Sequence, residues 1–70
     1  MILDQQKLDL AMASKCYNLT LLSKKSSVAY VSILKLKSNK MRLTPRTLGK
    51  LAKALNVQPI DLIKLEDEDD

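Results

Sequence analysis

The segment from Thr44 to Asn56 most constrains the fold, because it carries a complete set of helix signals. Thr44 followed by Pro45 is typical of a helix start, since the threonine side chain can cap a free amide and proline suits the first turn. Asn56 can adopt the left-handed conformation that ends a helix. Apolar residues between these signals recur at three- and four-residue spacing and predict a buried stripe of Leu48, Leu51, Ala52 and Leu55.

Weaker signals of the same kind predict two helices earlier in the chain. A first helix is expected from about Asp4, its cap, to Tyr17, with Asn18 as a left-handed stop. A short second helix is expected to start near Thr20, whose hydroxyl can cap an amide, and to end at the pair of serines at 26 and 27. The apolar residues of these two helices are Leu8, Ala11, Met12 and Cys16 in the first, and Leu21 and Leu22 in the second.

Two more helices complete the predicted bundle. A third is expected over residues 29–37, where Ala29, Ile33 and Leu36 fall on one stripe. Its Val, Ile and Tyr content would also permit a strand, but the spacing favours a helix, and Asn39 is a plausible left-handed terminator. A fifth helix is expected to begin at Pro59. Five short helices joined by tight connections predict an all-α fold, a compact bundle, over residues 1–65, followed by an acidic tail over 66–70.

Composition narrows the class of protein. Seventy residues bury only a modest core, and with 46% apolar but 3% aromatic residues that core must consist of aliphatic side chains. There is no histidine, and Cys16 is the single cysteine, so we expect neither a disulfide nor a metal or other cofactor. We expect Cys16 to face inward as a structural thiol. With acids near the chain ends only and Gly49 as the one glycine, we do not expect an enzyme.

The charge pattern points to a polyanionic partner. Between Asp9 and Asp61 there is no acidic residue, although ten of the twelve cationic residues lie there. The alternative is that these lysines only solvate helix faces. The acids of the tail, Glu66 to Asp70, either compete with phosphate for the cationic surface or keep a basic protein soluble. No apolar run approaches the roughly 20 residues of a membrane span, and the start of the chain lacks a secretory pattern, so we expect a cytoplasmic protein without membrane contact.

The stretch from Thr20 to Leu36 has the spacing that two steeply crossing helices require. Small side chains at Ser23 and Ser27 allow close approach, and apolar ones hold the two helices together: Leu22, Val28, Ile33 and Leu36. This pattern resembles the XRE family of helix-turn-helix regulators, which includes phage repressors and Cro proteins. The stretch LTPRTLGKLAKALNVQPIDL, from Leu43 to Leu62, is similar to the fourth and fifth helices of that family, and the resemblance covers about residues 8–65.

Three residues depart from the family pattern. Ser27 occupies the turn position where glycine is usual, Ser23 replaces alanine, and Leu19 replaces a glutamine at the head of the second helix. Because a left-handed residue other than glycine costs roughly 1–2 kcal/mol, we expect Ser27→Gly to be neutral or stabilising. Without the glutamine, phosphate contacts must come from other residues.

The resemblance implies a lambda-repressor-like fold and a sequence-specific regulator whose third helix enters the major groove of double-stranded DNA. The base-contacting residues that it implies are Tyr30, Val31, Ser32 and Lys35, with Leu34 beside them. Lys35 suits a guanine, Val31 a thymine methyl group, and Tyr30 a base or phosphate. The alternatives are packing of Tyr30, Val31 and Leu34 against the first helix or a partner, and simple solvation of Lys35.

Helix amino ends and loop cations are the candidate phosphate contacts, since free amides and positive charge attract phosphate. They are Thr20, Ser38, Lys40, Arg42, Thr44 and Arg46, each of which could instead be only a cap or a solvated cation. Regulators of this kind bind pseudo-palindromic operators as dimers. The expected homodimer surface lies on the last helix and comprises Val57, Ile60, Ile63 and Leu65, which could equally just close the core.

We therefore expect a homodimeric transcriptional regulator of bacterial or phage origin, associated with the nucleoid, with no small-molecule ligand. The alternative function is a protein-interaction module that keeps the fold, such as an antirepressor or a toxin-neutralising antitoxin. The apolar side chains of Tyr30, Val31 and Leu34 favour that alternative, because they could form a patch for another protein.

Overall fold

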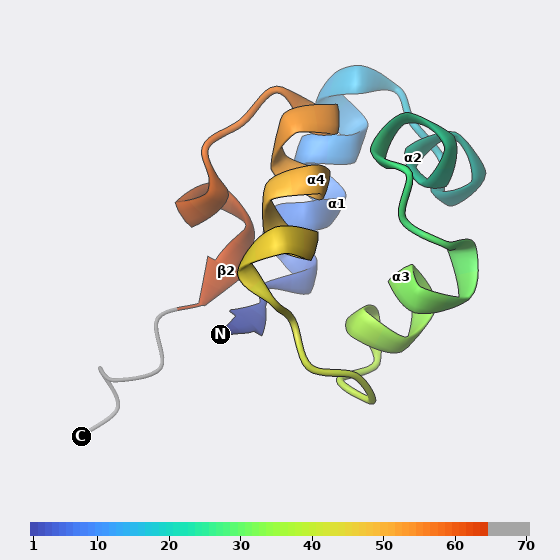
Figure 1. Cartoon of the computed structure of the whole chain (residues 1–70). Helices are drawn as coiled ribbons and strands as arrows, with labels where there is room; N and C mark the ends of the chain where they lie inside the picture. The colour runs from blue at the N-terminus through green and yellow to red at the C-terminus, as the bar shows by residue number, and fades with distance from the viewer. Residues whose placement is uncertain (65–70) are drawn as a thin grey trace.

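The computed structural model describes residues 1–64, whose helices pack around one aliphatic core (Figure 1). In chain order, the elements are β1 (Ile2–Leu3), α1 (Gln5–Lys15), α2 (Leu19–Ser26), α3 (Tyr30–Lys37), α4 (Pro45–Leu55), the 3₁₀ helix η1 (Pro59–Leu62) and β2 (Ile63–Lys64). The helical prediction is confirmed in part, because the described residues form four α-helices, not five, and a small sheet that the sequence did not predict. Among residues 1–64, no helix is long and apolar enough to cross a membrane.

Helix α4 follows its sequence signals closely. Thr44 Oγ1 accepts a hydrogen bond from the Thr47 amide at 3.2 Å, and Pro45 is the first helical residue. Asn56 ends the helix in the left-handed conformation, with φ of 57°. All four residues of the predicted stripe are buried: Leu48, Leu51, Ala52 and Leu55. Helix α4 packs against α2, η1 and α1, so it is the central element of the core.

The connection between α1 and α2 differs from the prediction. Helix α1 ends at Lys15, and Cys16, with φ of 58°, provides the left-handed residue that was expected at Asn18. Cys16 is exposed, so the prediction of an inward-facing thiol was wrong; a residue that leaves the helix no longer follows its apolar stripe. Asn18 instead caps α2, where its side-chain oxygen accepts from the Leu21 amide at 2.8 Å. Thr20 therefore lies inside the first turn of α2 and does not cap it.

Segment 30–37 is helical, which excludes the strand that its β-branched residues would also permit. Ile33 and Leu36 are buried as predicted. Ala29 was expected on the same stripe but is exposed, because it precedes the helix as its N-cap. Asn39 is left-handed as predicted, with φ of 63°.

The predicted fifth helix is only the four-residue η1. Leu62 at its end is fully buried, and the chain then becomes extended at Ile63, which has φ of −124° and ψ of 161°. Strand β2 pairs antiparallel with β1, with Ile2 opposite Lys64 and Leu3 opposite Ile63. A backbone hydrogen bond from the Asp4 amide to the Leu62 carbonyl, 2.9 Å, extends this pairing. The first and last elements of the described chain thus lie side by side (Figure 1).

Candidate nucleic-acid interface

The turn between α2 and α3 is held by hydroxyl groups. Ser27, at the predicted left-handed position, has φ of 62°, and its amide donates to the Ser23 carbonyl at 3.0 Å. The Ser23 hydroxyl donates to the Val28 carbonyl at 2.7 Å, and Ser26 Oγ accepts from the Val28 amide at 3.2 Å. These two hydroxyls satisfy both backbone groups of Val28, whose side chain is buried. Ser23 thus has a bonding role that alanine could not provide.

Helix α3 divides into an inner and an outer face. Ile33 and Leu36 are buried on the inner face. Of the predicted base-contacting residues, Tyr30 is 43% and Val31 58% exposed, Lys35 is also exposed, and Ser32 is half-buried. Val31 and Lys35 are four residues apart and therefore lie on the same side of the helix. The structure thus brings a cation and an apolar side chain together on an outward face that suits the edge of a base pair.

The apolar residues of this face do not belong to the core. Tyr30, Val31 and Leu34 were alternatively expected to pack against α1 or a partner. Leu34 is 41% exposed, and none of the three belongs to the core cluster or to the apolar residues packed against it. Packing against the core formed by residues 1–64 is therefore not their role. Contact with DNA and contact with a partner both remain compatible with their exposure.

Six exposed residues were predicted to contact phosphate, and the structure places them at two sites. Ser38, Lys40 and Arg42 lie in the α3–α4 loop, next to Thr44 and Arg46 at the start of α4, whereas Thr20 is in the first turn of α2. The loop folds back on α3 through a hydrogen bond from the Lys40 amide to the Lys35 carbonyl, 2.8 Å. The buried side chain of Leu43 anchors its other end.

The candidate phosphate contacts differ in whether their hydrogen-bond donors are already used within the protein. The Ser38 hydroxyl donates to the Leu34 carbonyl at 3.0 Å, and the Thr44 hydroxyl donates to Thr47 Oγ1 at 3.1 Å, so both protons are used within the chain. Because Pro45 has no amide hydrogen and the Thr47 amide is capped, the amide of Arg46 is the donor in the first turn of α4 that has no partner within residues 1–64. At α2, Asn18 caps the Leu21 amide, and the amides of residues 19 and 20 have no acceptor in the part of the chain that the structure describes.

The cations of the acid-free stretch fall into separate groups. The first group consists of cations that form no ion pair with any residue from 1 to 64. They are Lys35 on α3, Lys40 and Arg42 in the α3–α4 loop, and Arg46 at the start of α4. A second group lines a shallow hollow between α2 and α4 and consists of Lys25, Lys50 and Lys53. Lys37, at the end of α3, lies 3.3 Å from Asp9 of α1. The cations of the acid-free stretch are thus distributed over several elements, and that they share one surface stays a prediction.

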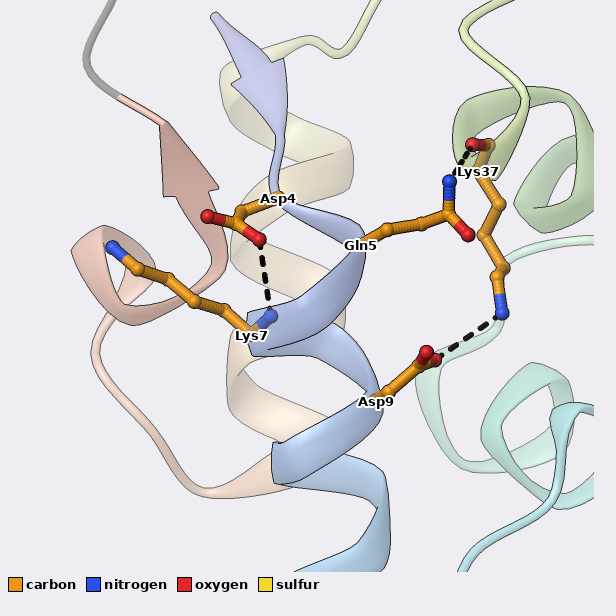
Figure 2. A network of polar contacts seen from close by, with 5 residues as sticks. All are labelled: Asp4, Gln5, Lys7, Asp9 and Lys37. Atoms are coloured by element: carbon orange, nitrogen blue, oxygen red, sulfur yellow. Dashed lines mark hydrogen bonds and ion pairs between the residues drawn. The ribbon is translucent and has the colours of Figure 1, made fainter.

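Contacts from α1 to the end of α3 were not predicted from the sequence. Figure 2 shows Gln5 and Asp9 of α1 directed toward Lys37 from two positions of the same helix. Gln5 Nε2 donates to the Lys37 carbonyl at 2.7 Å, while Asp9 binds the Lys37 ammonium. No motif in the sequence signals this arrangement, because the partners are 28 or more positions apart.

The four residues predicted to form a dimer surface differ in exposure. Ile60 is 51% exposed, whereas Val57 and Ile63 are half-buried and pack against the core. Leu65 lies outside the described residues. The alternative that these side chains close the core thus fits Val57 and Ile63, and among the three that lie within residues 1–64 Ile60 is the exposed one. Leu10 on α1, which sequence reasoning did not single out, is 66% exposed.

Comparison with known families agrees with this geometry. The family model of the Cro/C1-type helix-turn-helix DNA-binding domain matches residues 7–68, which include α2, α3, α4, the turn at Ser27 and all but the first two residues of α1. Comparisons with curated proteins and with solved structures gave no match. A domain of this family indicates a DNA-binding regulator, and such domains are typically not enzymes. The chain therefore belongs to the family of Cro/C1-type helix-turn-helix DNA-binding domains.

Proposed function

We propose that the protein is a sequence-specific transcription regulator of the repressor and Cro kind that inserts α3 into the major groove. The observation that supports this most is the division of α3 into a buried side with Ile33 and Leu36 and an exposed side with Val31 and Lys35. A groove about 12 Å wide admits a helix, and a lysine can bind guanine O6 and N7. Tyr30 and Ser32 flank this pair at the start of the helix.

Backbone phosphates are bound by cations that follow α3 in the chain. Lys40, Arg42 and Arg46 carry this role in the proposal, together with the free amides of Arg46 and Thr20. Ser38 and Thr44 contribute by shaping the loop and capping α4, because their hydroxyl protons are already bonded within the chain. Each phosphate neutralised steepens the dependence of log K on log salt by about 0.9.

Selection of duplexes from a random library, followed by binding assays with the selected and a mixed-sequence duplex, tests the proposal. We expect Lys35→Ala to lose preference for the selected duplex while retaining binding to mixed sequence. Lys53→Ala is the matched control, since Lys53 is exposed on α4 and lies at the hollow between α2 and α4. Failure to enrich any sequence, or equal effects of the two variants, would contradict base recognition by Lys35.

Dimer formation on a pseudo-palindromic operator is the second part of the proposal. Ile60 is the exposed apolar residue of the predicted surface, and a dimer would cover it. Ile60→Asp should shift sedimentation of the protein–DNA complex from two copies toward one. Leu10→Asp, which changes another exposed apolar residue, is the control. A dimer weakened by the Leu10 change alone would place the interface on α1.

A protein-interaction module remains the second candidate function. The exposure of Tyr30, Val31 and Leu34 favours it, because three apolar side chains on one short helix can bind another protein. Binding to mixed-sequence duplex at low and moderate salt discriminates between the two functions. A chain that binds no duplex at either salt concentration supports the interaction module, whereas salt-sensitive binding supports the regulator.

A further inference from the structure

Helix α1 contacts the carboxyl end of α3 through two groups of one residue, the carbonyl and the ammonium of Lys37. The Gln5 side-chain amide donates to the backbone carbonyl of Lys37 at 2.7 Å, and Asp9 Oδ1 lies 3.3 Å from the Lys37 ammonium (Figure 2). Gln5 and Asp9 are four residues apart, so they project from the same face of α1. We refer to these three residues as the α1–α3 clasp.

Buried side chains set the approximate rotation of α3 about its own axis, and few polar contacts refine it. The helix has no side-chain cap at Ala29, and its most extensive contact is with α2. Buried Ile33 and Leu36 hold its inner face, but apolar contacts are not directional. The clasp adds directional contacts, and one of them satisfies a carbonyl of the last helical turn.

The directions of Lys37 and Lys35 are linked by the geometry of the helix. At 3.6 residues per turn, two positions correspond to about 200° around the helix axis. Holding Lys37 against α1 therefore turns Lys35 away from α1 and toward the outer face. A rotation of α3 that broke the clasp would also move Lys35 and Val31 relative to the groove.

We infer that Gln5 and Asp9 are positioning residues for DNA recognition, and that Asp9 also withholds the Lys37 ammonium from DNA phosphates. The inference rests on the proposed function. The Lys37 side chain is only 22% exposed and Asp9 is 58% exposed, so the ammonium is directed to a carboxylate that stays in contact with solvent. A DNA phosphate is the competing anion, and Asp9 thereby favours specific over non-specific binding.

The contribution of Gln5 is tested with Gln5→Ala and a matched control, Gln6→Ala. Gln6 is the adjacent exposed residue, and its side chain has no hydrogen bond within residues 1–64. In free Gln5→Ala, we expect faster amide exchange at Ser38, Asn39 and Lys40, with unchanged exchange in α4. The ratio of binding to selected and mixed duplexes should fall about fivefold, the effect of one lost hydrogen bond. Gln6→Ala should leave both properties unchanged.

The contribution of Asp9 is tested by a double-mutant cycle with Lys37→Gln. Asp9→Asn alone frees the Lys37 ammonium to bind a phosphate. For this variant, the slope of log K against log salt concentration on mixed-sequence duplex should therefore be steeper by about 0.9. Between 50 and 200 mM salt, that slope corresponds to a further loss of affinity of about threefold. In the Lys37→Gln background, Asp9→Asn should not change the slope. An equal change in both backgrounds would indicate a general effect of net charge and would overturn the role of Asp9.

Failure of this inference is distinguishable from failure of the proposed function. If the unmodified protein prefers no duplex, the regulator proposal fails, while amide exchange still decides whether Gln5 orders the end of α3. If the unmodified protein is selective and Gln5→Ala behaves like Gln6→Ala in exchange and selectivity, the clasp has no positioning role. Uniformly faster exchange across α3 and α4 would indicate lost global stability instead and would equally overturn it.

Discussion

Replacement of Ser27 by glycine tests the physical account of the turn. Ser27 is left-handed, with φ of 62° and ψ of 25°, is exposed, and has no side-chain hydrogen bond within residues 1–64. Removing its Cβ relieves roughly 1–2 kcal/mol of left-handed strain. The added freedom of glycine in the unfolded chain offsets about 0.4–1 kcal/mol of this gain. We therefore expect Ser27→Gly to raise the free energy of unfolding by about 0.5–1 kcal/mol.

Thermal unfolding followed by circular dichroism measures this effect. For a domain of this size, the expected gain corresponds to a rise in Tm of roughly 2–8 °C. Ser14→Gly is the comparison, because the same substitution inside α1 should destabilise by about 0.5 kcal/mol or more and also removes the hydroxyl that donates to the Ala11 carbonyl. A clear fall in Tm for Ser27→Gly would refute the assignment of left-handed strain to this position.

Three further substitutions test individual contacts by urea denaturation. Ser23→Ala should cost about 1 kcal/mol, because it leaves the Val28 carbonyl without its donor; unchanged stability would deny the hydroxyl a role in the turn. Thr44→Ala should cost about 1 kcal/mol and Thr20→Ala clearly less, since only the first residue caps a helix. Leu62→Ala should cost about 2–5 kcal/mol, and a loss below about 1 kcal/mol would show that η1 is not anchored by this side chain.

Local signals in the sequence were sufficient to predict the conformation of residues that had one structural role. Thr44, Asn39 and Asn56 were predicted as caps or left-handed residues, and the structure confirms all three. The same reasoning failed at Asn18, because asparagine is favourable both as a left-handed terminator and as an N-cap. The choice between these roles depended on Cys16, which takes the left-handed position although its residue type does not favour it.

Features that depend on distant contacts could not be predicted. Strands of two residues have no periodicity, so the pairing of Ile2 with Lys64 has no signature in the sequence. At the candidate interface, the outward direction of Lys35 followed from the stripe of Ile33 and Leu36. The withdrawal of Lys37 toward α1 depended on Asp9, which is 28 positions away. Periodicity thus predicts which face of a helix is buried but not which polar groups hold it.

Pairing of β1 with β2 closes the described chain into a ring, because the paired residues Ile2 and Lys64 are 62 positions apart in the sequence. Antiparallel partners of this kind are only about 5 Å apart, whereas the ends of an unfolded chain of this length are far more distant. A dye on Lys64, which is exposed, and a quencher on the amino terminus would therefore report ring closure as a loss of fluorescence. Both labels lie outside α3, so their fluorescence can show whether the protein stays folded throughout a DNA titration.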